Sequence, residues 1–157
     1  MTHGLDTSAV VRIISGLPEG AAEKVGERIA AEIAGGDDFA VSALVLSETY
    51  FALQHHYAFT KEEALQSLLA FSQTEGIKIP ESIKPILKST NLARANPGFV
   101  DRMIVREYAA AGSDTYSCEK SFRRLDGTVV IVAQRSLSCC IYVSAPTVTM
   151  KTRQLSQ

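Results

Sequence analysis

Four carboxylates stand beside or within apolar stretches of the chain, where charged side chains are seldom found. Asp6 ends the first apolar run, and Glu119 ends a late one. Glu48 and Asp101 fall among apolar residues at helical spacing. Burying a charge is costly unless another group pairs with it. A divalent cation held by acids from distant parts of the sequence explains all four positions with one ligand.

The neighbours of Glu48 on its expected helix are all apolar. Residues three or four positions apart share one face of a helix, and for Glu48 these are Leu44, Val45, Phe51 and Ala52. We therefore predict that Glu48 lies on the buried stripe of this helix. Two simpler interpretations stay open, namely a pair with a buried arginine and a position at the rim of the stripe.

The same spacing argument applies to Asp101, which Ile104, Val105 and Tyr108 follow at helical intervals. Asp101 also falls in the first turn of its expected helix, where free backbone N–H groups favour an anion. A role at the helix end alone is therefore an alternative to a place in a functional site.

Asp6 and Glu119 each have a structural alternative as well. Asp6 could simply cap a helix, and Glu119 could be a surface acid that opens a short helix. The combination is more informative than any one member, because two acids follow strands and two face the expected core. Since parallel sheets bind ligands outside the carboxyl ends of their strands, we expect Asp6 and Glu119 to reach that edge.

Hydroxyl groups accompany these acids. Thr7, Ser8 and Ser117 could hold a water molecule at the site, and a capping or strand-surface role is an equally good interpretation. The sequence has no phosphate-binding glycine-rich loop, no Ser-His-Asp set and no zinc-ligand spacing.

The composition indicates one folded domain. The chain has 157 residues, of which 46% are hydrophobic and 21% charged, and its formal net charge is -1. Any basic surface must therefore be local. No apolar run is long enough to cross a bilayer. The three cysteines argue against a disulfide framework and favour a reducing, cytoplasmic setting.

Short strand-like runs alternate with longer helical segments. Strands are expected at residues 1–5, 39–41, 115–118 and 128–133, with a short strand or extended connection at 77–79. Helices are expected at about 7–14, 18–34, 43–57, 60–73, 81–95 and 99–111, with a short helical segment at 120–125. Ser42 and a Thr60–Glu63 capping box should begin two of them. This alternation predicts an α/β fold with a parallel sheet covered on both faces.

The segments that carry the acids resemble the PIN domain family, in particular the VapC-type ribonuclease toxins. They are residues 4–11, which read Gly-Leu-Asp-Thr-Ser-Ala-Val-Val, residues 41–49 with Glu48, residues 99–104 with Asp101, and residues 116–125 with Glu119. Each motif is short, but the four occur in the family's order. The resemblance covers residues 1–133 and implies a three-layer α/β/α sandwich with a central, mostly parallel sheet of short strands.

The resemblance implies a metal-dependent endoribonuclease that hydrolyses RNA phosphodiester bonds, as the toxin of a toxin–antitoxin pair. Asp6, Glu48, Asp101 and Glu119 would be catalytic, and Asp6, Asp101 and Glu119 would bind Mg²⁺ or Mn²⁺. These hard cations prefer carboxylate oxygen, and a metal-bound water is a better nucleophile. The resemblance also implies a small antitoxin partner and a homodimer.

Two features depart from the family pattern. The closing acid is usually an aspartate, whereas Glu119 is longer by one methylene. Residues 134–157 lie outside the resemblance; they are locally basic, and we expect one extra strand at about 138–144 and a frayed tail. Lys120, Arg123 and Arg124 directly follow Glu119 and are expected to contact RNA phosphates.

Three other interpretations compete with the nuclease. The protein could be a PIN-like module that binds protein or RNA. Its catalytic activity would be weak because Glu119 replaces the usual aspartate. A phosphatase of the haloacid dehalogenase type would use Asp6 as a nucleophile, but that motif needs a second aspartate where Ser8 stands. A structural protein without a site would leave Glu48 and Asp101 unexplained.

Overall fold

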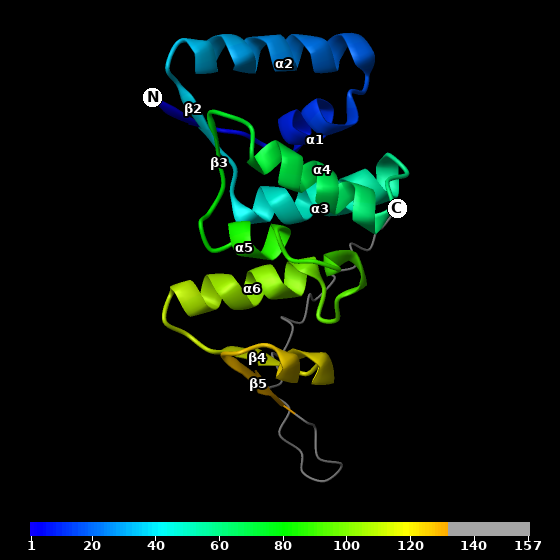
Figure 1. The fold of residues 1–157 in the computed structure, drawn as a ribbon, viewed down its shortest axis with the longest axis vertical. Helices are drawn as coiled ribbons and strands as arrows, with labels where there is room; N and C mark the ends of the chain where they lie inside the picture. Colours follow the sequence, from blue (N-terminus) through cyan, green and yellow to red (C-terminus); the bar gives the residue numbers. More distant parts are fainter. Residues whose placement is uncertain (132–157) are drawn as a thin grey trace, which may run out of the picture.

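A computed structural model describes residues 1–131 of the chain. The strands are β1 (Thr2–Gly4), β2 (Asp38–Ala40), β3 (Ile77–Lys78), β4 (Thr115–Ser117) and β5 (Thr128–Val130). The α-helices are α1 (Thr7–Ser15), α2 (Glu19–Ala34), α3 (Ala43–His56), α4 (Lys61–Ser72), α5 (Lys84–Leu87) and α6 (Phe99–Ala110). Two 3-10 helices, η1 (Leu92–Arg94) and η2 (Lys120–Arg124), complete the set. The molecule is elongated, with α2 at one end and β4 and β5 at the other (Figure 1).

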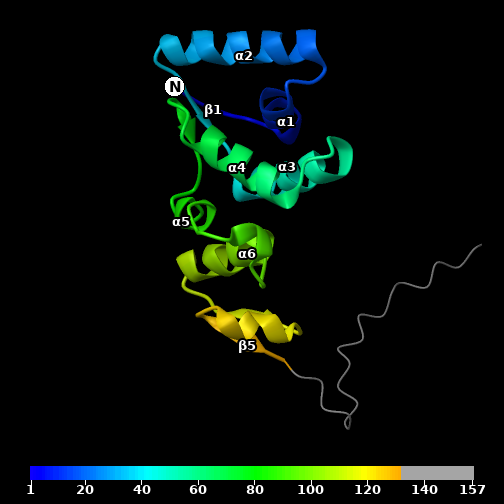
Figure 2. The same cartoon turned by 45° about the vertical axis from the view of Figure 1, so that its right-hand side comes forward.

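The strands confirm the predicted α/β class, and all of their pairings are parallel. They form a three-stranded sheet in the order β1-β2-β3 and a separate two-stranded sheet of β4 and β5. In the larger sheet His3 is in register with Phe39, and Phe39 with Ile77. Both views show the two sheets separated by α5 and α6 (Figures 1 and 2). Within residues 1–131, therefore, β1 and β4 each have one free edge.

Local capping explains where several helices begin. The side chain of Ser42 accepts a hydrogen bond from the backbone N–H of Val45 at the start of α3. Thr60 and Glu63 form the predicted capping box at the start of α4. Gly16 ends α1 in the left-handed conformation, with φ of 70°, which glycine adopts without steric cost. The predicted cap at Ser42 and the predicted capping box of Thr60 and Glu63 are therefore confirmed.

The main core lies between the larger sheet and the helices that follow it. The cluster includes fully buried residues from α1, α3 and α4, and it reaches α6 through Phe99 and Met103. Its largest fully buried side chains are Phe99, Leu46, Leu53, Leu68 and Ile83. Phe122 and Thr115 are buried outside this cluster, so β4, β5 and η2 pack separately from the main core.

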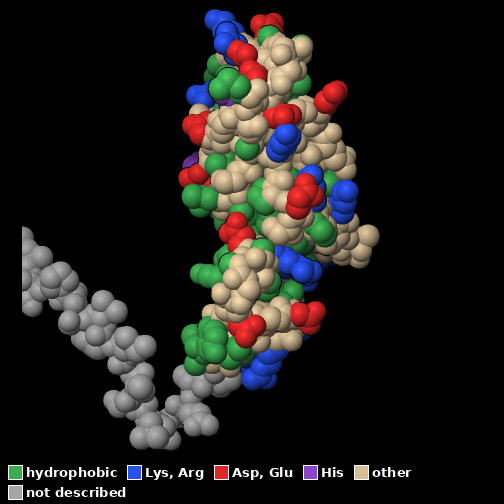
Figure 3. Space-filling view, turned by 90° about the vertical axis from the view of Figure 1, so that its left-hand side faces the viewer, with side chains coloured by type: hydrophobic (Ala, Val, Ile, Leu, Met, Phe, Trp, Pro, Cys, Tyr) green, Lys and Arg blue, Asp and Glu red, His purple; other side chains and the backbone are tan. Residues whose placement is uncertain are grey.

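The end of the molecule formed by β4 and β5 is apolar on its surface. Tyr116, Val129 and Ile131 are exposed there, Tyr116 by 67%. Figure 3 shows apolar side chains gathered at this end of the molecule. These residues are the hydrophobic positions of strand-like runs, and in this arrangement their side chains remain outside a core.

One predicted helix is wrong. Residues 81–95 contain only the short α5 and η1 rather than one continuous helix. Asn91 adopts a positive φ of 59°, which a helix cannot continue through, and Pro85 can be accommodated only at the beginning of α5. The predicted strands at 1–5 and 128–133 are shorter than expected within the described part.

Residues 132–157 lie outside the described residues, and with them the predicted C-terminal extension and its extra strand. Among residues 1–131, no helix combines the length and the apolar character that a membrane span requires.

Candidate active site

Asp6 lies where the chain leaves the larger sheet. The N–H of Leu5 still donates to Ala40 O, so the sheet pattern continues to the residue before Asp6. One Asp6 oxygen then accepts a hydrogen bond of 2.9 Å from the N–H of Ala9 and caps α1. The helix-cap alternative is therefore real, and it places the carboxylate at the carboxyl end of β1.

The hydrogen bonds around Asp6 stabilise its charged form. The backbone N–H of Ala9 is the largest influence, followed by the Ser8 hydroxyl, and together they lower the pKa of Asp6 below its usual value. The Ser8 hydroxyl is 3.1 Å from each oxygen of the carboxylate. Asp6 is consequently an exposed anion just beyond the end of a strand.

Glu48 meets this position from α3. The hydroxyl of Thr7 donates a hydrogen bond to Oε2 of Glu48. This bond joins the residue after Asp6 to a helix far along the sequence, and α1 packs on α3. Glu48 is thus held against the residue that directly follows Asp6, and two of the predicted supporting hydroxyls bond to these acids, Ser8 to Asp6 and Thr7 to Glu48.

The prediction that Glu48 lies on a buried stripe is wrong. Glu48 is exposed, and so are its neighbours Leu44, by 74%, and Phe51, by 46%. The buried face of α3 carries Leu46, Tyr50 and Leu53 instead. The error arises because α3 is apolar on nearly every face, so apolar neighbours do not identify the face that meets the core.

Asp101 lies in the first turn of α6, as predicted, and is half-buried. The prediction that its face of the helix meets the core is wrong for Ile104 and Tyr108, which are exposed. Its Oδ2 accepts a hydrogen bond of 3.1 Å from the N–H of Gly98, so it also stabilises the beginning of the helix. The next residue, Arg102, turns back and donates from Nε to Pro97 O at 3.0 Å. The helix-end interpretation of Asp101 is therefore part of its role here.

Glu119 follows β4 and is exposed. Its contacts are local: Ser121 donates to Oε2 at 3.4 Å, and Ser117 accepts from the Glu119 N–H at 3.0 Å. Lys120, Arg123 and Arg124 continue into η2 on the surface, and all three are exposed.

The four acids do not meet in this arrangement. Asp6 and Glu48 lie beside the larger sheet, whereas Glu119 follows a strand of the separate smaller sheet. Residues 1–131 contain no group of three or more His, Cys, Asp or Glu side chains that could hold a metal ion. The oxygen-only donor set fits Mg²⁺ or Mn²⁺ by type, but its assembly into one site is not seen.

The carboxyl end of the larger sheet is hollowed. A cavity of about 540 Å³ is lined there by Gly4, Leu5, Val41 and Ile79, among others. It is the place where open parallel sheets accept ligands. The predicted edge for ligand binding is therefore open next to Leu5, but neither Asp6 nor Glu48 lines this cavity.

The sequence model of the PIN domain family matches residues 5–127, so this chain belongs to the PIN domain family. The PIN domain is generally a nuclease fold, and its members typically use divalent metal ions. The predicted fold class is confirmed by this match together with the short parallel strands. Neither the curated proteins nor the solved structures contain a match to the chain.

Proposed function

We propose that this protein is a metal-dependent endoribonuclease of the VapC type, the toxin of a toxin–antitoxin pair. The observation that carries the proposal is the bond from Thr7 to Glu48, which ties a second carboxylate to the residue directly after Asp6 in a PIN domain. Oxygen ligands at this edge suit Mg²⁺ or Mn²⁺. Such an ion, when bound, supplies an activated water and stabilises charge on the reacting phosphate.

The protein's own side chains have distinct duties in this proposal. Asp6 presents a carboxylate that the Ala9 N–H and the Ser8 hydroxyl keep ionised. Thr7 fixes the orientation of Glu48 from a neighbouring element. Lys120 and Arg123 are exposed cations next to Glu119 and would attract the RNA backbone. Asp101 and Glu119 complete the proposed set and would bind the metal together with Asp6.

Equal distances from the strand ends support one way for these members to join the first pair. Asp6 stands two residues beyond the end of β1 at Gly4, and Glu119 stands two residues beyond the end of β4 at Ser117. Both strands have a free edge within the described residues. We propose that β4 pairs in parallel beside β1, because equal offsets then bring the two acids level at the same edge.

The proposed activity has a direct test. Purified full-length protein is incubated with a mixed RNA pool and either Mg²⁺, Mn²⁺ or EDTA. We expect cleavage with either metal, none with EDTA, and a strong loss in Asp101→Asn. Asp114→Asn is a matched control, because Asp114 is an exposed acid outside the proposed set. Equal cleavage by the wild type and Asp101→Asn would contradict the proposal.

Strand pairing is tested separately by a disulfide. Leu5 and Cys118 each stand one residue beyond their strand, at Gly4 and Ser117. In a Cys139→Ser/Cys140→Ser background, Leu5→Cys leaves one possible pair of thiols. Paired strands are about 4.8 Å apart, within the span of a disulfide. We expect oxidation to link residues 5 and 118, within one chain or between two copies, and not to link Cys118 in a Leu17→Cys control.

A PIN-like binding module without strong activity is the second candidate, and the separation of Glu119 from Asp6 favours it. Preparations that cleave no RNA with either metal, yet retain a partner protein, would select this candidate. For the toxin, the expected partner is a small antitoxin whose inserted segment covers the acids, and a homodimer is expected by size-exclusion chromatography with light scattering.

A further inference from the structure

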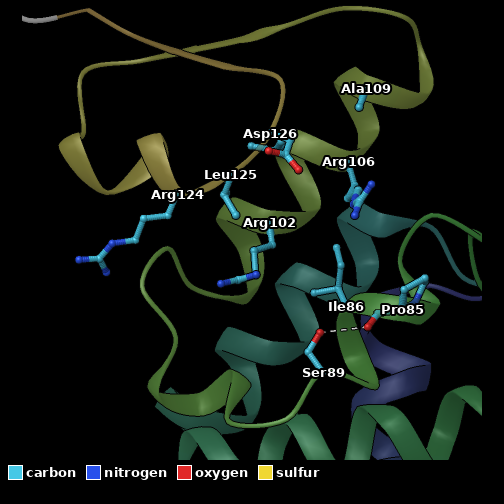
Figure 4. Close-up of a pocket in the computed structure, with 10 residues that line it drawn as sticks. Pro85, Ile86, Ser89, Arg102, Arg106, Ala109, Arg124, Leu125 and Asp126 are labelled. Carbon is cyan, nitrogen blue, oxygen red and sulfur yellow. Dashed lines mark hydrogen bonds between the residues drawn. The ribbon is translucent and has the colours of Figure 1, made fainter.

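A cavity lined by arginines lies beside α5 and α6, the helices between the two sheets (Figure 1). It has a volume of about 320 Å³ and lies between α5, α6 and the residues that follow η2. Arg102, Arg106 and Arg124 line it together with Pro85 and Ile86. Figure 4 shows Arg102 and Arg124 extending to the same side of the cavity, with Arg106 and Asp126 on the other side.

Arg102 and Arg124 are held by consecutive backbone carbonyls. Arg102 donates from Nε to Pro97 O at 3.0 Å, and Arg124 donates from Nη1 to Asn96 O at 3.1 Å. Two residues far apart in the sequence thereby direct their guanidinium groups to one turn. Because backbone bonds fix each group, less side-chain entropy is lost when an anion binds.

Within the described part of the chain, most donors of the two arginines have no hydrogen-bond partner and can bind a ligand. A guanidinium group carries several N–H donors in a planar fork that fits phosphate, and each of these groups uses one in the bond just described. Among residues 1–131, neither arginine has a carboxylate within salt-bridge distance. Asp126 lines the same cavity, but no ion pair joins it to Arg102, Arg106 or Arg124 within that range.

We propose that Arg102 and Arg124 form a binding site for one backbone phosphate of an RNA strand. The site adjoins Asp101, whose carboxylate and the Arg102 guanidinium arise from the same turn of α6. Pro85 and Ile86 give the cavity an apolar wall against which a ribose can pack. A charged side joined to an apolar side suits a nucleotide better than a free inorganic anion.

The identification of the ligand as RNA rests on the proposed function, so the test measures binding without cleavage. Full-length protein carrying Asp6→Asn is titrated in EDTA with a fluorescent single-stranded RNA. Arg124→Gln and Arg102→Gln are compared with Arg28→Gln, which removes the same charge from α2, where Arg28 pairs with Glu32. Arg124 is exposed, so its replacement leaves the fold intact, and circular dichroism checks this.

We expect either site substitution to weaken RNA binding about tenfold, the size of a lost charge-assisted hydrogen bond. The slope of log affinity against log salt should fall by about 0.7, as for one phosphate contact to a single strand. The double variant should lose less than the product of the single losses, because both arginines hold the same phosphate. Arg124→Lys should recover only part of the affinity, since it lacks the planar fork.

Two results would overturn the proposal. One is equal RNA affinity of Arg124→Gln and Arg28→Gln. The other is saturable binding of inorganic phosphate that Arg124→Gln abolishes while RNA affinity stays unchanged, which would make this a site for free anions. Failure of the nuclease proposal is distinguishable, because it appears as cleavage that does not respond to Asp101→Asn, whatever the arginine variants do.

Discussion

Around the larger sheet, Glu48 of α3 accepts a hydrogen bond from Thr7, the residue after Asp6 on α1. Within residues 1–131, Asp101 and Glu119 instead bond only to residues two or three positions away in sequence. The first pair is positioned by tertiary packing, since α1 and α3 both contribute to the main core. The second pair is oriented by a helix end and a short turn. The first pair of acids thus depends on contacts between distant elements, whereas the second pair depends on local structure.

The packing of the two regions differs in the same way. The larger sheet is covered by helices that share one core cluster. The β4 and β5 end keeps Phe122 and Thr115 buried but leaves Tyr116 and Ile131 exposed. Pairing of β4 with β1 would give these apolar residues new neighbours, and so connect the less packed region to the better packed one.

The largest expected effect comes from removing an acid of the first pair. Asp6→Asn should lower RNA cleavage about a thousandfold, because several kcal/mol of transition-state stabilisation depend on the bound cation. Asparagine caps a helix as well as aspartate, so the melting temperature should change little. Single-turnover cleavage with Mg²⁺ is the measurement.

Glu119→Gln is the matching change in the other region. We expect a loss of only about tenfold, because Glu119 extends from the separate smaller sheet and would be the weakest of the three metal ligands. Equal losses in Asp6→Asn and Glu119→Gln would contradict this difference between the two regions.

Loss of the link between α1 and α3 should have the next largest effect. Thr7→Val keeps the shape of the side chain but removes the hydroxyl that bonds Glu48, and we expect cleavage to fall about thirtyfold, within the range for groups that orient metal ligands. Thr7→Ser retains the hydroxyl and should keep most of the activity. Metal affinity measured by calorimetry should follow the same order.

Substituting one glycine in each region compares how much stability each region loses when a side chain is added. A Cβ on Gly76 would lie 2.7 Å from Ile33 Cγ1, at a φ of +75°. Gly112 has a similar φ of +74°, with nothing within 4 Å. Gly76→Ala should therefore lower the free energy of unfolding by about 2 kcal/mol, through strain and overpacking, and Gly112→Ala by about 1 kcal/mol, through strain alone. Urea titration measures both, and equal losses would show that the Ile33 contact relaxes freely.

The smallest expected effect is a change in thermal stability at acidic pH. The hydroxyl and then the N–H of Thr60 lower the pKa of Glu63 in the folded protein. The stabilisation is therefore present above the unfolded pKa of about 4.3 and is lost as the pH falls through the lower folded value. Glutamine preserves a capping box without titrating, so thermal melts from about pH 5 to 3 should show a slightly shallower decline in Glu63→Gln. A decline identical to that of the wild type would exclude the linkage.

Local signals in the sequence predicted what local physics decides. The Ser42 cap and the Thr60–Glu63 box depend on residues three positions apart, so both follow from the sequence. The order of the four acid-bearing segments was sufficient to indicate the PIN family, which the family match confirms.

Features that depend on distant contacts could not be predicted in this way. The exposed position of Glu48 depends on which face of an apolar helix meets the core. The break at Asn91 overrides a helical pattern through one positive φ. The meeting of Arg102 and Arg124 at the turn of Asn96 and Pro97 requires the packing of η2 beside α6, and neither segment encodes it alone.

The equal spacing of Asp6 from β1 and of Glu119 from β4 limits how this gene can vary in length. Successive side chains of an extended segment point to opposite faces, so one residue inserted after Gly4 or Ser117 would turn the carboxylate to the other face. Two inserted residues would restore the face but move the acid outward by about 7 Å. We therefore expect variants of this protein to carry no insertions or deletions between Gly4 and Asp6 or between Ser117 and Glu119, even where their surface loops differ in length.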